Sequence, residues 1–277
     1  MVERRLIARA AVAGALALAG CATAPAPAAP PDGYLPAAAL DRLAALTPPP
    51  MEEAAPWQAA LVAAVPPGTD RWWLATAHAE LRPPWAAQHF DCVLGTRLAE
   101  RPRPALSRMM GRLTADATAV ARRSPAVAGS EGTRRPFVAI GGLEPCERIP
   151  DAVRDSLSWP ATGAMVAGVY GELFAALAPD AAGPVRSLAR EIGFSRVVCR
   201  MNWPSDVEAG LAQGVGLYRQ ASAEPAFSAD LEAARAELAA ARAEGLASPA
   251  CAAERRALAQ WRAPSSDQLR GDPSSDG

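Results

Sequence analysis

The sequence contains no lysine and only two histidines, His78 and His89. All 28 basic residues are arginine, and they balance 29 acidic residues without a basic cluster between the ends. Nucleic acid is therefore not expected as a partner, because a surface that follows a phosphate backbone needs clustered positive charge. Two histidines without suitably spaced carboxylates predict no metal site, and no cofactor is expected. We expect each histidine to be a surface or partly packed residue of the N-terminal helices.

The first 20 residues are typical of a secretory signal peptide. Three arginines precede an Ala/Leu/Val run that is too short and wrongly flanked for a stable membrane-spanning helix. The run ends at Leu18-Ala19-Gly20-Cys21, which resembles the lipobox of bacterial lipoproteins, where the cysteine is acylated and becomes residue one. Because Ala22 is not aspartate, this resemblance implies the outer membrane, facing the periplasm, with contact through the lipid only. The alternative is an ordinary signal peptide followed by a chance cysteine.

The composition divides the remaining chain into three parts. Residues 21–33 form an Ala/Pro tract suited to an extended tether, 34–262 form the folded domain, and the Ser/Asp/Pro/Gly-rich tail 263–277 is expected to be disordered. An even number of further cysteines in an oxidising compartment predicts two disulfides of open connectivity, the alternative being buried free thiols. The four candidates are Cys92, Cys146, Cys199 and Cys251.

Apolar residues recur at helical spacing from Tyr34 onward, in Ala/Leu/Arg/Glu-rich segments bordered by Pro or Gly. Strand-like runs are limited to 137–140 and 196–199, and neither has a partner. The sequence therefore predicts one all-α domain. The expected helices cover 36–46, 52–65, 70–80, 85–100, 105–123, 162–177, 185–192, 205–221, 228–244 and 250–261.

Three segments depart from simple amphipathic packing. They are Arg134-Arg135-Pro136, then Pro160-Ala161-Thr162-Gly163, then Ser195-Arg196 followed by Asn202 and Asp206. Their order and separation resemble the three-part signature of the class A bacterial acid phosphatases in the PAP2 superfamily. That signature reads Lys-x6-Arg-Pro, Pro-Ser-Gly-His and Ser-Arg-x5-His-x3-Asp. The resemblance extends over nearly the whole mature chain and implies a compact helical bundle.

The family chemistry implied by this resemblance is hydrolysis of phosphate monoesters. Arginines and a lysine hold the phosphate oxygens, and a neutral imidazole, oriented by an aspartate, attacks phosphorus to form a phosphohistidine. A second histidine protonates the departing alkoxide. The matching positions in this sequence are Arg135, Ser195 and Arg196 for phosphate binding and Asp206 for orientation.

The match fails at the reacting positions. Ala128 stands where the signature has lysine, Gly163 replaces the acid histidine, and Asn202 replaces the nucleophile. An asparagine amide cannot form the phosphoenzyme, and glycine has no proton to donate. Ser195 as a substitute nucleophile lacks a visible base. Asp206 is expected to pair an arginine or to hydrogen-bond the Asn202 amide.

Three functional hypotheses follow. The leading one is a catalytically impaired pseudophosphatase that keeps at most a pocket for phosphate or a small phosphorylated ligand. A second is a weakly active acid phosphatase that uses water positioned by Arg135, Arg196 and Asp206. A third is a helical scaffold or partner-binding lipoprotein without any ligand, in which the arginines form structural ion pairs. The sequence leaves the oligomeric state open.

Overall fold

The computed structural model describes residues 32–46, 56–125 and 133–270. The expected signal peptide, Cys21, nearly all of the tether, Ala128 and residues 271–277 lie outside these ranges. Within the described residues the chain is helical and contains no strand, only an isolated bridge between Arg134 and Leu157. The predicted all-α class is therefore confirmed.

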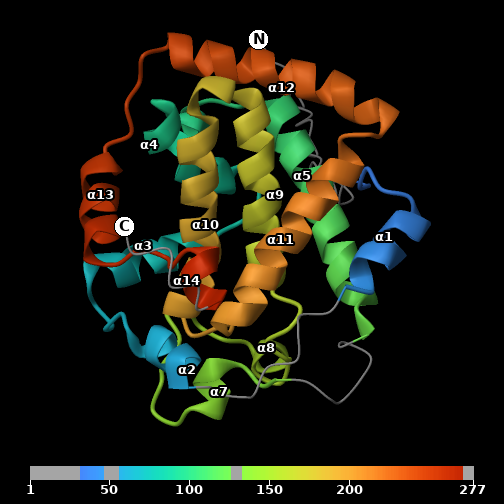
Figure 1. Cartoon of the computed structure of the whole chain (residues 1–277). Coiled ribbons are helices and arrows are strands. Elements are labelled where there is room, and N and C mark those ends of the chain that lie inside the picture. The colour runs from blue at the N-terminus through green and yellow to red at the C-terminus, as the bar shows by residue number, and fades with distance from the viewer. Residues whose placement is uncertain (1–31, 47–55, 126–132, 271–277) are drawn as a thin grey trace, which may run out of the picture.

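Three long helices form the centre of the molecule (Figure 1). α9 (Thr162–Leu177) packs against α10 (Ala182–Val198) and α11 (Pro204–Ala221). α9 is apolar nearly all round, as expected for a helix surrounded by protein. The short 3-10 helix η3 (Pro179–Ala181) closes the α9–α10 hairpin at the top of Figure 1.

The other helices cover this centre. α12 (Pro225–Ala243) runs across the top in Figure 1 and packs on α5 (Pro104–Arg123), which begins with proline at its first position. The remaining elements are α1 (Ala37–Ala44), α2 (Pro56–Ala63), α3 (Asp70–His78), η1 (Trp85–Phe90), α4 (Asp91–Leu94), η2 (Leu98–Glu100), α7 (Pro136–Ala139), α8 (Asp151–Arg154), α13 (Cys251–Gln260) and α14 (Ser266–Arg270).

Glycines let α9 and α11 approach closely. A Cβ on Gly214 would lie 2.2 Å from the Met165 carbonyl oxygen, and one on Gly168 would lie 2.5 Å from the Leu211 carbonyl oxygen. Only glycine fits at such a backbone contact. Gly168 and Gly214 therefore serve helix packing.

One predicted helix is interrupted. The expected helix 85–100 is divided into η1, α4 and η2. Gly95 adopts a left-handed conformation with φ 67°, which ends α4 and separates it from η2. Past that turn, the Asp91 carboxylate accepts the Leu98 N–H at 2.7 Å and fixes the start of η2.

The two strand-like runs are also helical, which corrects the sequence interpretation. Residues 137–140 fall on α7 and its end, where Pro136 provides a helix start, and 196–199 complete the last turn of α10. Val197 and Val198 are fully buried, and the partly buried Val138 packs on the cluster around Val198, so this packing outweighs their local β preference.

The C-terminal segment is ordered further than predicted. Glu191 on α10 accepts the Ala263 N–H at 3.1 Å, and Arg190 donates to the Pro264 carbonyl at 2.8 Å. α14 follows, with the Ser266 hydroxyl bonded to Glu208. These contacts hold 263–270 against α10 and α11, where disorder was expected.

Two disulfides join distant parts of the chain, Cys92–Cys251 and Cys146–Cys199. They confirm the prediction of two bridges and settle the pairing that the sequence left open. The first connects α4 to the start of α13, and the second connects the loop before α8 to the end of α10. Within the described ranges, no helix is both long and apolar enough to cross a bilayer.

Candidate functional site

The three motif segments meet at one end of the central helices. α9 and α11 begin there and α10 ends there, with α7 and α8 below them in Figure 1. The Phe137 N–H donates to the Arg200 carbonyl at 3.2 Å and ties the first segment to the third. We call this end of the molecule the motif region.

Charged side chains of the motif region lie within electrostatic reach of one another. Burial, together with the charge of Arg196, lowers the pKa of Arg135 to about 10. Asp206 and Glu147 oppose this shift. Folding thus gathers two arginines and two carboxylates, three of which the sequence analysis had singled out.

Arg135 is bonded to the protein itself. Its Nη1 donates to the Met201 carbonyl at 2.8 Å, and its Nη2 and Nε donate to the Ser156 hydroxyl at 2.9 and 3.1 Å. Nε also lies 3.2 Å from the Val153 carbonyl. The guanidinium therefore connects the end of α10 to α8 and its following turn.

Arg196 is paired with a carboxylate of the protein. Its Nη1 donates to Glu147 Oε1 at 2.8 Å, while its buried Nε has no hydrogen-bond partner among the described residues. Glu147 is next to Cys146, whose disulfide to Cys199 fixes this loop against α10. The loop thereby places the Glu147 carboxylate against the Arg196 guanidinium.

Asn202, at the nucleophile position, is buried at 3% exposure, and its amide nitrogen donates to the Ser158 carbonyl. The Ser158 hydroxyl accepts the Trp203 N–H at 3.1 Å. Asn202 and Ser158 thus join the start of α11 to the segment before α9. The amide has a structural partner and no acid–base function.

Asp206 forms neither of the expected contacts. Among the described residues it has no salt bridge to an arginine, and the Asn202 amide is bonded elsewhere. Burial raises the pKa of Asp206 to about 6, while the Ser158 hydroxyl and the charge of Arg135 partly oppose that shift. Its Oδ2 is buried without a hydrogen-bond partner in the described part of the chain. Its carboxylate is thus held in a poorly solvated place between α9 and α11.

Gly163 is covered by Arg196. A Cβ at Gly163 would lie 3.1 Å from Arg196 Cδ and 3.3 Å from Nε, tighter than most such contacts. A histidine at this position would require Arg196 to move. The glycine at position 163 therefore leaves the space that the Arg196 side chain occupies.

Ser195 is not brought together with Arg196. Consecutive residues of an α-helix point about 100° apart, and the Ser195 hydroxyl turns toward α3. There it accepts from Arg71 Nη1 at 3.1 Å and lies 2.8 Å from His78 Nδ1. Arg71 is fully buried, and its Nη2 lies 3.6 Å from Glu191.

Both histidines are buried, contrary to the expectation of surface or partly packed side chains. His78 is 1% exposed and His89 6%, with their ring centroids 5.0 Å apart. The hydrogen bond to His78 gives Ser195 a neighbouring imidazole that the sequence did not reveal. Because Ser195 is only 1% exposed and bonded on all sides, it is placed as a structural hydroxyl and not as a nucleophile.

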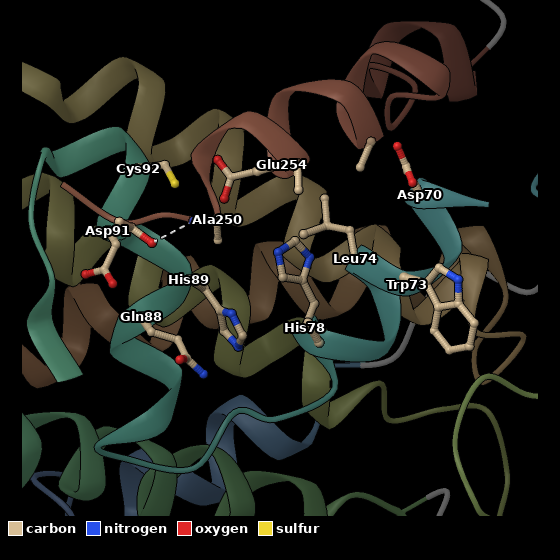
Figure 2. A pocket seen from close by; sticks show the side chains of 14 residues that line it. Asp70, Trp73, Leu74, His78, Gln88, His89, Asp91, Cys92, Ala250 and Glu254 are labelled. Carbon is tan, nitrogen blue, oxygen red and sulfur yellow. Dashed lines mark hydrogen bonds between the residues drawn. The ribbon is translucent and has the colours of Figure 1, made fainter. Parts of the chain in front are cut away.

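A cavity of about 370 Å³ lies beside the two histidines, between α3, the η1–α4 segment and α13 (Figure 2). We call it the His78 cavity. No residue of the acid phosphatase signature lines it. In the ranges that the structure covers, no group of three or more His, Cys, Asp or Glu side chains is arranged to hold a metal ion.

Sequence reasoning missed four residues that organise these regions: Arg71, His78, Glu147 and Ser158. Glu147 and Ser158 had a usable signal, since one follows a cysteine and the other immediately precedes the second motif. Arg71 and His78 had none, because their contact with Ser195 spans more than a hundred residues.

The fold and the motif region are those of an all-helical protein with an arginine–carboxylate cluster held by a disulfide. No family model matches the chain. It is 28% identical over 172 residues to a protein named acid phosphatase from Zymomonas mobilis, covering 62% of this chain and 64% of that protein. It is 26% identical over 171 residues to a non-specific acid phosphatase from Providencia stuartii, covering 61% of this chain and 67% of that protein. These similarities support a relation to the acid phosphatases, and the chain spans about two thirds of the length of both relatives.

Proposed function

We propose that this chain is a pseudophosphatase of the bacterial envelope, anchored through a lipid on Cys21, which binds phosphate or a small phosphate monoester without hydrolysing it. The observation that carries the proposal is the state of the nucleophile position, where the Asn202 amide is bonded to the Ser158 carbonyl. Since no imidazole occupies that position or Gly163, neither the phosphohistidine nor the protonated leaving group can form.

Arg196 is the proposed anion contact. It combines a salt bridge to Glu147, which is itself 31% exposed at its side chain, with a buried Nε that has no partner among the described residues. A phosphate that replaced the Glu147 carboxylate would accept from Nη1 and from the adjacent Nη2 at the end of the guanidinium fork. Arg135 would add positive charge while keeping its bonds to Met201 and Ser156. Ser195 has no part in this proposal because its hydroxyl faces α3.

The test is phosphate-dependent thermal melting of the wild-type protein and of Glu147→Gln. A ligand that binds only the native state raises Tm with its concentration. We expect millimolar phosphate to raise the Tm of both proteins, and the midpoint of the response to fall by about tenfold in Glu147→Gln because the competing charge is removed, equivalent to ~1.4 kcal/mol.

Glu172→Gln, which affects a carboxylate paired with Arg186 outside the motif region, is the matched control and should respond as the wild type does. Equal ionic strength from sodium chloride corrects for screening. A Tm that phosphate does not change in either protein would refute the binding proposal and favour a scaffold without a ligand.

A further inference from the structure

The His78 cavity is acidic. Asp70, Asp91 and Glu254 line it, and no arginine is among its lining residues (Figure 2). Asp70 lies 3.4 Å from Arg256, whereas Glu254 and Asp91 have no salt bridge within the described ranges. The cavity is therefore unsuited to phosphate. It favours a ligand of positive charge, whereas the motif region is proposed to bind a ligand of negative charge.

His78 presents an unused hydrogen-bonding atom to this cavity. Its ring is 1% exposed, Nδ1 is taken by Ser195, and Nε2 has no partner among the described residues. Figure 2 shows the ring in the middle of the lining side chains, between His89 and Glu254. A buried polar atom without a partner costs free energy, which a ligand that supplies the bond would recover.

The hydrogen bonds around Ser195 indicate that Nε2 is an acceptor. The Ser195 hydroxyl lies 2.9 Å from the Glu191 carbonyl and can donate its single proton there. His78 Nδ1 then carries the ring proton and donates to Ser195, which leaves a lone pair on Nε2. Burial keeps the pKa of His78 well below its usual value, and His89 and Arg71 add to that effect, so the ring is neutral.

The carboxylates of the cavity favour a cation because they are partly buried. Burial raises the pKa of Glu254, and the neighbouring Asp91 raises it further. Burial likewise raises the pKa of Asp91 to about 6. His89 contributes no positive charge, because burial also lowers its pKa. Arg97 and Arg255 oppose these shifts only in part, and the Asp91 carboxylate is already bonded to the Leu98 N–H, so Glu254 is the carboxylate that a bound positive charge would stabilise most.

A primary ammonium group matches these features. It is a compact cation with three N–H donors, and the cavity offers acceptors on His78 and Glu254. Trp73, 60% exposed and beside Asp70 in Figure 2, supplies an aromatic surface that favours cations. A volume of about 370 Å³ suits a small molecule. We propose that the His78 cavity binds a small primary amine, with the ammonium group between Glu254 and His78 Nε2.

The two histidines provide a direct test, because the full chain should give only two histidine Cε1–H signals in a carbon–proton correlation spectrum and both rings line the cavity. Ethanolamine hydrochloride is the probe, titrated at constant ionic strength and neutral pH. We expect both signals to shift with a common saturable midpoint. Ethylene glycol, which has no charge, and tetramethylammonium, which has no N–H, should each require at least tenfold higher concentration.

Glu254→Gln should raise the ethanolamine midpoint at least fivefold, while Glu232→Gln, an exposed carboxylate on α12, should leave it unchanged. The proposal is wrong if the wild-type histidine signals do not saturate with ethanolamine, or if either control molecule binds equally well. It is also wrong if Glu254→Gln, with its melting temperature shown to be near that of the wild type, binds like the wild type.

Discussion

The motif region and the His78 cavity lie on different faces of α10 and differ in how their polar groups are used. In the motif region, Arg135 bonds to Met201 and Ser156, Arg196 pairs with Glu147, and Asn202 bonds to Ser158. At the cavity, His78 keeps a buried nitrogen without a described partner and the carboxylates lack arginine partners apart from Asp70. The residues that resemble a catalytic signature are thus mostly engaged in structure, whereas residues outside the signature remain free to bind.

This difference shows why a motif match is a weak guide to present chemistry. Arg135 and Arg196 have structural partners in this protein, whereas Asp206 is buried with an oxygen that has no partner among the described residues. Each region also contains one disulfide, Cys146–Cys199 in the motif region and Cys92–Cys251 at the cavity. The two can therefore be perturbed separately.

Removing either disulfide should have the largest effect on stability. The bridges close loops of 53 and 159 residues, for which loop entropy gives about 4 and about 5 kcal/mol respectively. We expect Cys146→Ser/Cys199→Ser to weaken the phosphate response and to leave ethanolamine binding intact, and Cys92→Ser/Cys251→Ser to do the reverse. Urea unfolding with both ligand titrations measures this. Equal loss of both responses in each variant would show that the regions are not independent.

Arg135→Ala should cost about 3 kcal/mol, because the Met201 carbonyl and other buried acceptors lose their donors. Arg134→Ala is the matched control: its side chain is exposed, and its carbonyl, which accepts from Trp203 Nε1, is retained. Urea unfolding compares the two variants. Similar stability losses would mean that the bonds of Arg135 to Met201 and Ser156 do not stabilise the fold. The Arg135 guanidinium would then be available to bind phosphate directly.

Asp206→Asn should change how stability depends on pH. The carboxyl pKa rises from 3.8 to about 6 on folding, so the native state binds the proton more tightly than the unfolded state between these values. Asp206 therefore lowers wild-type stability as the pH rises through this window. Asp206→Asn should gain about 2 kcal/mol relative to the wild type between pH 4 and 7. Unfolding free energies that differ by the same amount at both pH values would contradict this assignment.

Much of the fold could be predicted from the sequence, because helical periodicity and the Pro and Gly borders are local signals. The helix 162–177 agrees with α9 as observed, and 205–221 differs from α11 by one residue. The break after α4 comes from the left-handed Gly95, which the hydrophobic period does not reveal, and the helical state of 196–199 depends on tertiary packing.

The candidate site could be predicted only in part. The spacing of the signature placed Arg135, Arg196 and Asp206 near one another, as observed. The orientation of the Ser195 hydroxyl toward α3 and its contact with His78 could not be inferred, because both depend on the packing of α3 against α10. The Glu147–Arg196 pair likewise depends on a disulfide whose partners the sequence left open.

The most direct test of the central claim is p-nitrophenyl phosphate turnover by the purified protein from Tyr34 onward, from acid to neutral pH, beside an Arg135→Ala/Arg196→Ala control. We predict that the wild-type protein and the control have equal rates, both at the background of the assay, because Asn202 and Gly163 supply neither a nucleophile nor an acid. Turnover well above the control would reveal a nucleophile or activated water in the motif region and would contradict the pseudophosphatase proposal.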